Sequence, residues 1–150
     1  MTKRGTIQAV CISTEKGTRK KPIEAGRLVE DHGLQDDAHA GMRRRQVSLL
    51  CEESIEKMRK KGADVGPGDF AENLTVEGLG PGDFHLGDTI RLQRGPVLEV
   101  TQIGKKCHSE CEIARQVGTC VMPKEGLFAR VIEGGQVLPG DWIEVSDHED

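Results

Sequence analysis

Three cysteines crowd one short stretch of the chain and are the residues best suited to chemistry. Cys107, Cys111 and Cys120 lie within 14 residues, in the segment KKCHSECEIARQVGTCVMP. A cysteine reacts as its thiolate, and neighbouring cations lower the pKa of a thiol. Lys105 and Lys106 directly precede Cys107. The sequence therefore predicts a nucleophilic or metal-binding thiol site in this segment.

Cys120 is the principal candidate within the cluster. It follows Gly118 in a stretch without apolar periodicity, so we expect it in a loop where a substrate can reach it, although free cysteines are often buried. Cys111 falls in the first turn of a helix predicted to begin at Ser109, where Glu112 completes a capping box. The helix start favours a thiolate by only ~0.3–1 kcal/mol, so the lysines must contribute as well.

The same cluster supports two other interpretations. With His108, the three thiols could form a tetrahedral zinc site, although their spacing differs from that of paired Cys-x-x-Cys ligands. A thiol–disulfide switch would join Cys107 or Cys111 to Cys120. It would require their Cα atoms to lie within about 7 Å, which a sequence does not show.

A glycine-rich segment before the arginine run holds a second candidate group, Asp36, Asp37 and His39. A carboxylate next to an imidazole can orient it for proton transfer or metal binding. The alternative is that Asp37 and His39 only bind the backbone amides of a turn. A site role for His39 remains one of two open interpretations.

Polar residues on either side of the predicted helix at 51–62 form the remaining candidates. The run of Arg43, Arg44 and Arg45 suits a phosphate because guanidinium groups offer bidentate donors, but it could equally be a solvated face. Further on, Asp69, Glu72 and Asn73 could form the polar floor of a site, with Glu72 as a surface charge in the alternative.

The elements that must position these residues are mostly short strands. Nineteen glycines recur between β-branched runs, which is typical of strands joined by turns. Seven strands are predicted, at residues 6–12, 46–50, 73–77, 89–92, 97–103, 128–133 and 142–145. A helix follows Leu50, with Cys51, Ile55 and Met58 on one buried face and Gly62 at its end. With the helix at Ser109, the prediction is a mostly β fold: a closed or partly closed β-barrel with two or more short helices.

The length and the net charge of the chain indicate how many domains it has and which kinds of partner to exclude. At 150 residues we expect one domain, 1–150, with its core at about 6–145 and a frayed acidic end at 147–150. A net charge of −4, with only three Phe and one Trp, argues against nucleic acid as a partner. No apolar stretch approaches the roughly 18 residues of a membrane helix, so we expect a cytoplasmic protein without a membrane partner. Five cysteines in a reducing compartment are not expected to form a disulfide framework.

Several stretches together resemble the MOSC domain, the molybdenum-cofactor sulfurase C-terminal domain family. They are GLQDDAHAGMRRRQVSLL, GDFAENLTVEGL, HLGDTIRL, LEVTQIGKKCHSECEI and CVMPKEGLFARVIEGGQVLPGDWIEV, in this order, between residues 6 and 145. The resemblance implies a β-barrel that carries sulfur as a persulfide on Cys120, or holds molybdopterin with Cys120 as the molybdenum ligand. It also implies that Arg45 and Asn73 lie near the pterin and its phosphate, with His39 and Lys105 as further cofactor-binding candidates.

The resemblance favours a sulfur carrier over a reductase. The chain lacks the additional N-terminal sheet domain of the molybdenum-bearing enzymes and carries Cys107 and Cys111 as extra thiols, so it looks like a short stand-alone form. We therefore expect a sulfur-transfer domain that needs neither pyridoxal phosphate nor another cofactor. Its expected partners are a cysteine desulfurase or another sulfur donor, and proteins of molybdenum cofactor synthesis or molybdoenzymes. A molybdenum-cofactor-binding carrier or reductase of N-hydroxylated substrates is the alternative, and a zinc-stabilised module without enzymatic activity is the third hypothesis.

Overall fold

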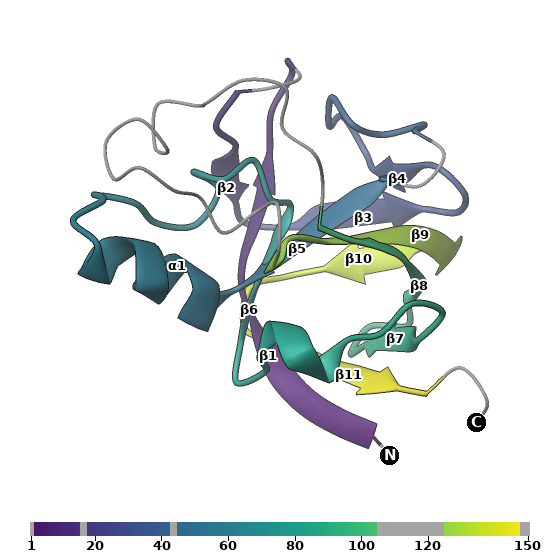
Figure 1. The fold of residues 1–150 in the computed structure, drawn as a ribbon. Helices are drawn as coiled ribbons and strands as arrows, with labels where there is room; N and C mark the ends of the chain where they lie inside the picture. The colour runs from purple at the N-terminus through teal and green to yellow at the C-terminus, as the bar shows by residue number, and fades with distance from the viewer. Residues whose placement is uncertain (1, 16–17, 43–44, 105–124, 148–150) are drawn as a thin grey trace.

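A closed β-barrel forms the body of the molecule in the computed structural model, which describes residues 2–15, 18–42, 45–104 and 125–147. Seven strands follow one another around the barrel in the order β1, β6, β5, β9, β8, β7, β11, and β11 pairs again with β1 to close it (Figure 1). Closure leaves these seven strands no open edge. Their bounds are β1 Thr2–Ile12, β5 Val47–Cys51, β6 Leu74–Glu77, β7 Thr89–Leu92, β8 Val97–Ile103, β9 Leu127–Glu133 and β11 Trp142–Ser146.

The longest strand, β1, makes three contacts along its length. Its first half pairs with β11, its middle with β6, and its end with the short strand β2 (Lys21–Ile23). A register shift between Ile7 and Ala9 marks a β-bulge, which bends the strand and lets one chain segment serve two neighbours. A separate three-stranded sheet consists of β3 (Gly26–Val29), β4 (Gly33–Leu34) and β10 (Gly135–Val137).

One helix covers the outside of the barrel. Strands β5 and β6 are parallel, so their connection must cross over, and α1 (Glu52–Lys60) lies in that connection (Figure 1). Side chains alternate along β5: Val47 and Leu49 point into the barrel core, whereas Leu50 packs outside with Ile55 and Met58 of the helix. The outer face of β5 and β9 is therefore a second buried surface.

The predicted strands and the first helix are confirmed, with differences of detail. All seven predicted strands are barrel strands, and Gly62, at a φ of 102°, follows the end of α1 as predicted. Cys51 is buried as expected, but its placement on the helix face is wrong. It continues the inward alternation of β5 and packs in the barrel core, because the strand runs one residue further than predicted.

The prediction of two or more short helices is not confirmed. The part of the chain that the structure describes holds one α-helix, α1, and one 3-10 turn, η1 (Pro81–Asp83). The helix predicted at Ser109 and the acidic residues 148–150 lie outside the described residues. Among the described helices, neither has the length and apolar character needed to cross a bilayer.

Candidate functional site

The three clustered cysteines and Lys105 lie outside the described residues, but the chain on both sides of them is placed. Strand β8 leads into residue 105, and the amide of Gly104 donates a 2.7 Å hydrogen bond to the carbonyl of Gly126, just before β9. Glu125 accepts hydrogen bonds from Ser54 Oγ at 2.6 Å and from Lys57 Nζ at 3.1 Å, both on α1. The described residues that flank the cysteine segment, Gly104 and Glu125, thus lie where β8 and β9 meet α1.

The two described cysteines, Cys11 and Cys51, are both free and have no exposed surface. Burial, together with a nearby carboxylate, Glu72 at Cys11 and Glu53 at Cys51, raises the pKa of each thiol to about 12. Each is therefore a protonated, unreactive thiol at neutral pH.

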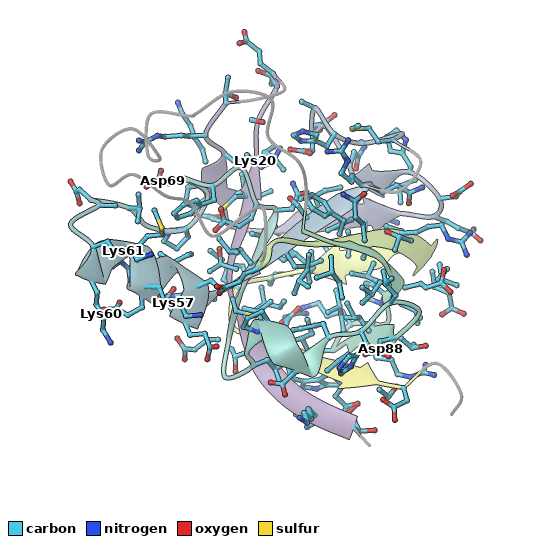
Figure 2. All side chains as sticks on the ribbon, viewed as in Figure 1. Lys20, Lys57, Lys60, Lys61, Asp69 and Asp88 are labelled. Carbon is cyan, nitrogen blue, oxygen red and sulfur yellow. The ribbon has the colours of Figure 1, made fainter. Side chains whose placement is uncertain are left out.

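A buried ion pair lies where β1 ends, and Lys20, which the sequence did not single out, is its cation. The side chains of Lys20 and Asp37 are both 0% exposed, and Lys20 Nζ lies 2.8 Å from Asp37 Oδ1. Lys20 Nζ also contacts Ser13 Oγ at 3.1 Å and His39 Nδ1 at 3.0 Å. Figure 2 shows Lys20 at the upper end of the barrel. In sequence it stands in a run of three basic residues, a pattern typical of a solvated surface.

The predicted pairing of Asp37 with the His39 ring is not direct. Asp37 Oδ2 lies 3.9 Å from His39 Nδ1 and instead accepts a 3.0 Å hydrogen bond from the His39 amide, as in the turn alternative. Burial alone would raise the pKa of Asp37. Hydrogen bonds from Lys20 and from the amides of Ser13 and His39 outweigh it, so the pKa of Asp37 falls below its ordinary value. Lys20 is thus the group that contacts both carboxylate and imidazole.

A layer of buried polar groups covers the outside of β1, β5 and β6. Asn73 is fully buried, and its side chain accepts hydrogen bonds from Ser48 N and Oγ while donating to Cys11 O at 3.0 Å. Beside it, Glu72 is also fully buried, which excludes the surface-charge alternative. Burial raises the pKa of Glu72, although Thr75 Oγ and the Phe70 amide donate hydrogen bonds to its carboxylate.

Gly68 joins this polar layer to the ion pair. Its carbonyl accepts a 2.8 Å hydrogen bond from the Lys20 amide. A Cβ at this position would lie 2.2 Å from Lys20 O and 3.2 Å from Cys11 Sγ, and the φ of +88° also favours glycine. The chain at Gly68 therefore packs directly on Lys20 and Cys11.

Arg45 lies on the same outer face of the barrel. Its guanidinium stands over the Phe128 ring, 5.9 Å from the ring centre, a cation–π arrangement. Phe128 is the strand partner of Ser48, which binds Asn73. The structure thus connects Arg45 with Asn73 through Ser48 and Phe128, and connects both to the Lys20–His39 group through Cys11 and Gly68.

A groove between other elements lies away from these residues. It has a volume of about 980 Å³ and lies between α1 and the connection from β6 to η1, lined by acidic residues such as Glu52, Glu53 and Glu77. None of the predicted site residues that the structure describes lines it. Within the described residues, no three His, Cys, Asp or Glu side chains converge to hold a metal ion. The zinc hypothesis, which depends on residues 107–120, stays a prediction.

Comparisons with known proteins agree with this architecture. The chain is similar to the YuaD protein from Bacillus subtilis, at a TM-score of 0.82 and 18% identity, with 98% of each chain covered. It is also similar to YiiM from Geobacillus stearothermophilus, at a TM-score of 0.70 and 20% identity over 95% of this chain and 75% of that one. YiiM from Escherichia coli is similar at a TM-score of 0.67 and 20% identity, over 97% of this chain and 70% of that one.

These solved structures, all at or below 20% identity, show the shared fold alone. No curated protein sequence matches the chain. The sequence itself, however, shows the family. The family model of the MOSC domain matches residues 36–144, which is well over half of the 150 residues. The chain therefore belongs to the MOSC domain family, which is related to the molybdenum cofactor.

Proposed function

We propose that this protein carries sulfane sulfur for the maturation of the molybdenum cofactor or of another metal–sulfur centre, held as a persulfide on Cys120. The observation that carries the proposal is the state of the other thiols. Cys11 and Cys51 are sealed and protonated, so sulfur chemistry in this chain falls to Cys107, Cys111 and Cys120. MOSC family membership supports the link to the molybdenum cofactor.

The transfer step needs only a thiolate and a donor persulfide. The Cys120 thiolate attacks the terminal sulfur of a persulfide on the donor, the donor S–S bond breaks, and the donor leaves as its own thiolate. The new S–S bond is the Cys120 persulfide, with no net oxidation or reduction. Cys107 or Cys111 would serve as a second carrier or as the resolving thiol that releases the sulfur.

The proposal names its partners by this chemistry. A cysteine desulfurase supplies the persulfide, and a protein of molybdenum cofactor synthesis or a molybdoenzyme accepts the sulfur. The proposal places the protein in the cytoplasm, where reducing conditions keep thiols free for transfer.

Mass spectrometry after loading by a desulfurase tests the carrier function. We expect the native protein to gain the mass of one sulfur atom, and we expect Cys120→Ser to lose this gain. Cys51→Ser is the matched control, because Cys51 is buried and should leave the loading unchanged. Undiminished loading in Cys120→Ser would contradict the proposal.

A molybdenum-cofactor-binding protein is the second candidate, and Arg45 is the observation that favours it. Its half-buried guanidinium, stacked on Phe128, fits a phosphate such as that of molybdopterin. Asn73 fits less well, since it is 0% exposed and its amide binds Ser48 and Cys11. Its predicted cofactor role stays a prediction, as does that of His39. When bound, the molybdenum centre would supply the redox chemistry, with Cys120 as its ligand.

Metal and pterin analysis separates the two candidates. Protein produced in a host that makes the cofactor should contain neither molybdenum nor pterin if it is a sulfur carrier alone. One molybdenum and one pterin per chain, lost in Cys120→Ser, would favour the second candidate. An Arg45→Ala variant that loses pterin but keeps its fold would place the phosphate at Arg45.

A further inference from the structure

The groove beside α1 has carboxylates on both of its walls, and we call it the acidic groove. It lies between α1 and the connection from β6 to η1, with a volume of about 980 Å³. Glu52, Glu53 and Glu56 line it from the helix, and Glu77 and Asp83 line it from the other wall. Like charges on facing walls repel each other, so a cation between the walls would stabilise this arrangement.

On the helix wall, one carboxylate oxygen lacks a partner. Arg59 Nη1 binds Glu52 Oε1 at 2.7 Å and Glu56 Oε2 at 3.0 Å, and so compensates these two charges. The second oxygen of Glu52, Oε2, is buried and has no hydrogen-bond partner within the described part of the chain. A buried acceptor without a donor is unfavourable, so Glu52 gives a donor in the groove an acceptor to satisfy.

Two carboxylates of the groove lack a cation altogether. Asp83 is bound by Lys3 at 2.6 Å, whereas Glu53 and Glu77 are exposed and form no ion pair with any described residue. A Cβ at Gly80 would lie only 2.8 Å from Glu53 Oε1. The Glu53 carboxylate therefore reaches across from α1 to the opposite wall, and the uncompensated charge lies inside the groove.

The shape of the charge distribution indicates what kind of cation fits. Among the described residues, no three His, Cys, Asp or Glu side chains converge to hold a metal ion, so the carboxylates are spread along the groove. An extended chain with several lysines or arginines matches this spread better than a single ion. A second copy of this protein does not fit, because its net charge is −4.

The acidic groove also borders one end of the cysteine segment. Lys57 and Lys60 line the groove in the second half of α1, where Figure 2 shows them. Lys57 Nζ binds both carboxylate oxygens of Glu125 at 3.1 Å. Glu125 directly follows residues 105–124 in the chain. A protein bound in the groove would therefore lie beside the residue at which that segment ends.

We propose that the acidic groove docks a lysine- or arginine-rich segment of the partner protein that exchanges sulfur with this chain. The proposal deepens the proposed function, on which it rests for the role of the partner. Exposed ion pairs contribute little affinity each and are screened by salt, so the docking is weak and salt-dependent. Its main effect is to orient the partner and to speed the encounter.

A fluorescently labelled peptide of six lysines is the probe for the groove. We expect the native protein to bind it at low salt, and we expect Glu53→Lys/Glu77→Lys to weaken the binding about tenfold. Glu24→Lys/Glu30→Lys is the matched control, because it reverses two exposed carboxylates outside the groove and gives the same net charge. The control should weaken binding by about twofold at most. An equal loss of affinity in both variants, or no binding to the native protein, would overturn the proposal.

NMR of the native protein locates the peptide without any substitution. The amides of Gly78, Gly80 and Gly82, which line the groove, should shift saturably as the peptide is added. The amides of Gly95 and Gly140, which are outside the groove, should not respond. Shifts at other residues without a response of the three groove glycines would overturn the proposal.

Loading by a desulfurase separates this proposal from the carrier function. Glu53→Lys/Glu77→Lys should raise the apparent KM for the desulfurase about tenfold, while the final gain of one sulfur atom on Cys120 stays unchanged. An unchanged KM would overturn the docking proposal alone. If even the native protein gains no sulfur, the carrier function is contradicted, and the peptide titration still decides whether the groove binds a basic segment.

Discussion

Two buried carboxylates in this protein have opposite titration behaviour, and their partners explain the difference. Asp37 is bound by the Lys20 ammonium and by two backbone amides, which together lower its pKa despite burial. Glu72 has a hydroxyl and amides as donors, and none of the described cations is in hydrogen-bond contact with it, so burial prevails and its pKa rises. Stability at acid and at neutral pH therefore depends on different residues.

Lys20→Met should destabilise the fold because it leaves the Asp37 carboxylate buried without its cation. Breaking a buried pair from one side costs about 3–5 kcal/mol, and urea unfolding at pH 7 measures it. The depressed pKa of Asp37 stabilises the fold above its ordinary pKa, and this contribution is lost as the pH falls through the folded-state value. Lys20→Met should therefore lose its disadvantage in acid.

The next residue provides the control for this prediction. Lys21 is exposed, so Lys21→Met should change the free energy of unfolding by no more than about 0.5 kcal/mol. If the free energy of unfolding fell equally in both variants, the loss in Lys20→Met could not be assigned to the buried ion pair.

Glu72→Gln should stabilise the protein more at pH 7.5 than at pH 4.5. A carboxyl whose pKa is raised by folding stabilises the folded state only while both states hold the proton. That contribution is lost as the pH rises from the ordinary value, 4.5, through the folded-state value. Glutamine removes this dependence. Unfolding across the pH range should show a growing advantage of the variant, whereas the exposed control Glu77→Gln should show none.

At the scale of elements, Asn73 connects three strands that the backbone alone would join less firmly. It stands directly before β6, accepts from Ser48 in β5 and donates to Cys11 in β1. The β5–β6 pair is the parallel contact in the barrel, with a long connection between its strands. A side-chain amide at this junction supplies hydrogen bonds just beyond the end of the β6 ladder.

Asn73→Ala should lower the free energy of unfolding by about 2–4 kcal/mol, because it leaves the Ser48 amide and the Cys11 carbonyl buried without these partners. Chemical denaturation measures the loss. Gln136→Ala, which removes an exposed amide from β10, should have little effect. If Asn73→Ala is as stable as the wild type, the structural role of Asn73 is contradicted, and the cofactor role predicted from the sequence stays open.

At the scale of the whole molecule, the barrel divides the cysteines into two classes. Cys51 lies within the barrel core, and Cys11 is sealed on its outer face, so neither can react without opening of the fold. Reactivity toward an alkylating agent is therefore a measure of folding at these two positions.

Alkylation with N-ethylmaleimide should modify two more thiols per chain in denaturant than in the native protein. Peptide mapping should locate this difference at Cys11 and Cys51, because their thiols stay protonated and covered until the barrel unfolds. A Cys11→Ser/Cys51→Ser double variant should abolish the difference. Rapid native labelling of either residue would remove the support for assigning sulfur chemistry to residues 107–120.

The sequence by itself determined the seven barrel strands and the helix that crosses from β5 to β6. Glycine and proline turns and runs of β-branched residues are local signals, so they are readable without a partner strand. The short strands β2, β3, β4 and β10 were missed because each has two to four residues and contains glycine or proline, which weakens any strand pattern. Their extended form depends on pairing with distant segments.

The residues of the candidate site divide in the same way. Asp37 and His39 could be singled out from their types and spacing, and Arg45 and Asn73 from resemblance to a family. Only the tertiary structure could show that Lys20 is buried between Asp37 and His39, since the ion pair with Asp37 joins residues 17 positions apart and the hydrogen bond with His39 joins residues 19 positions apart. Strand order, barrel closure and the inward direction of Cys51 were likewise decided by long-range contacts, which local sequence patterns do not encode.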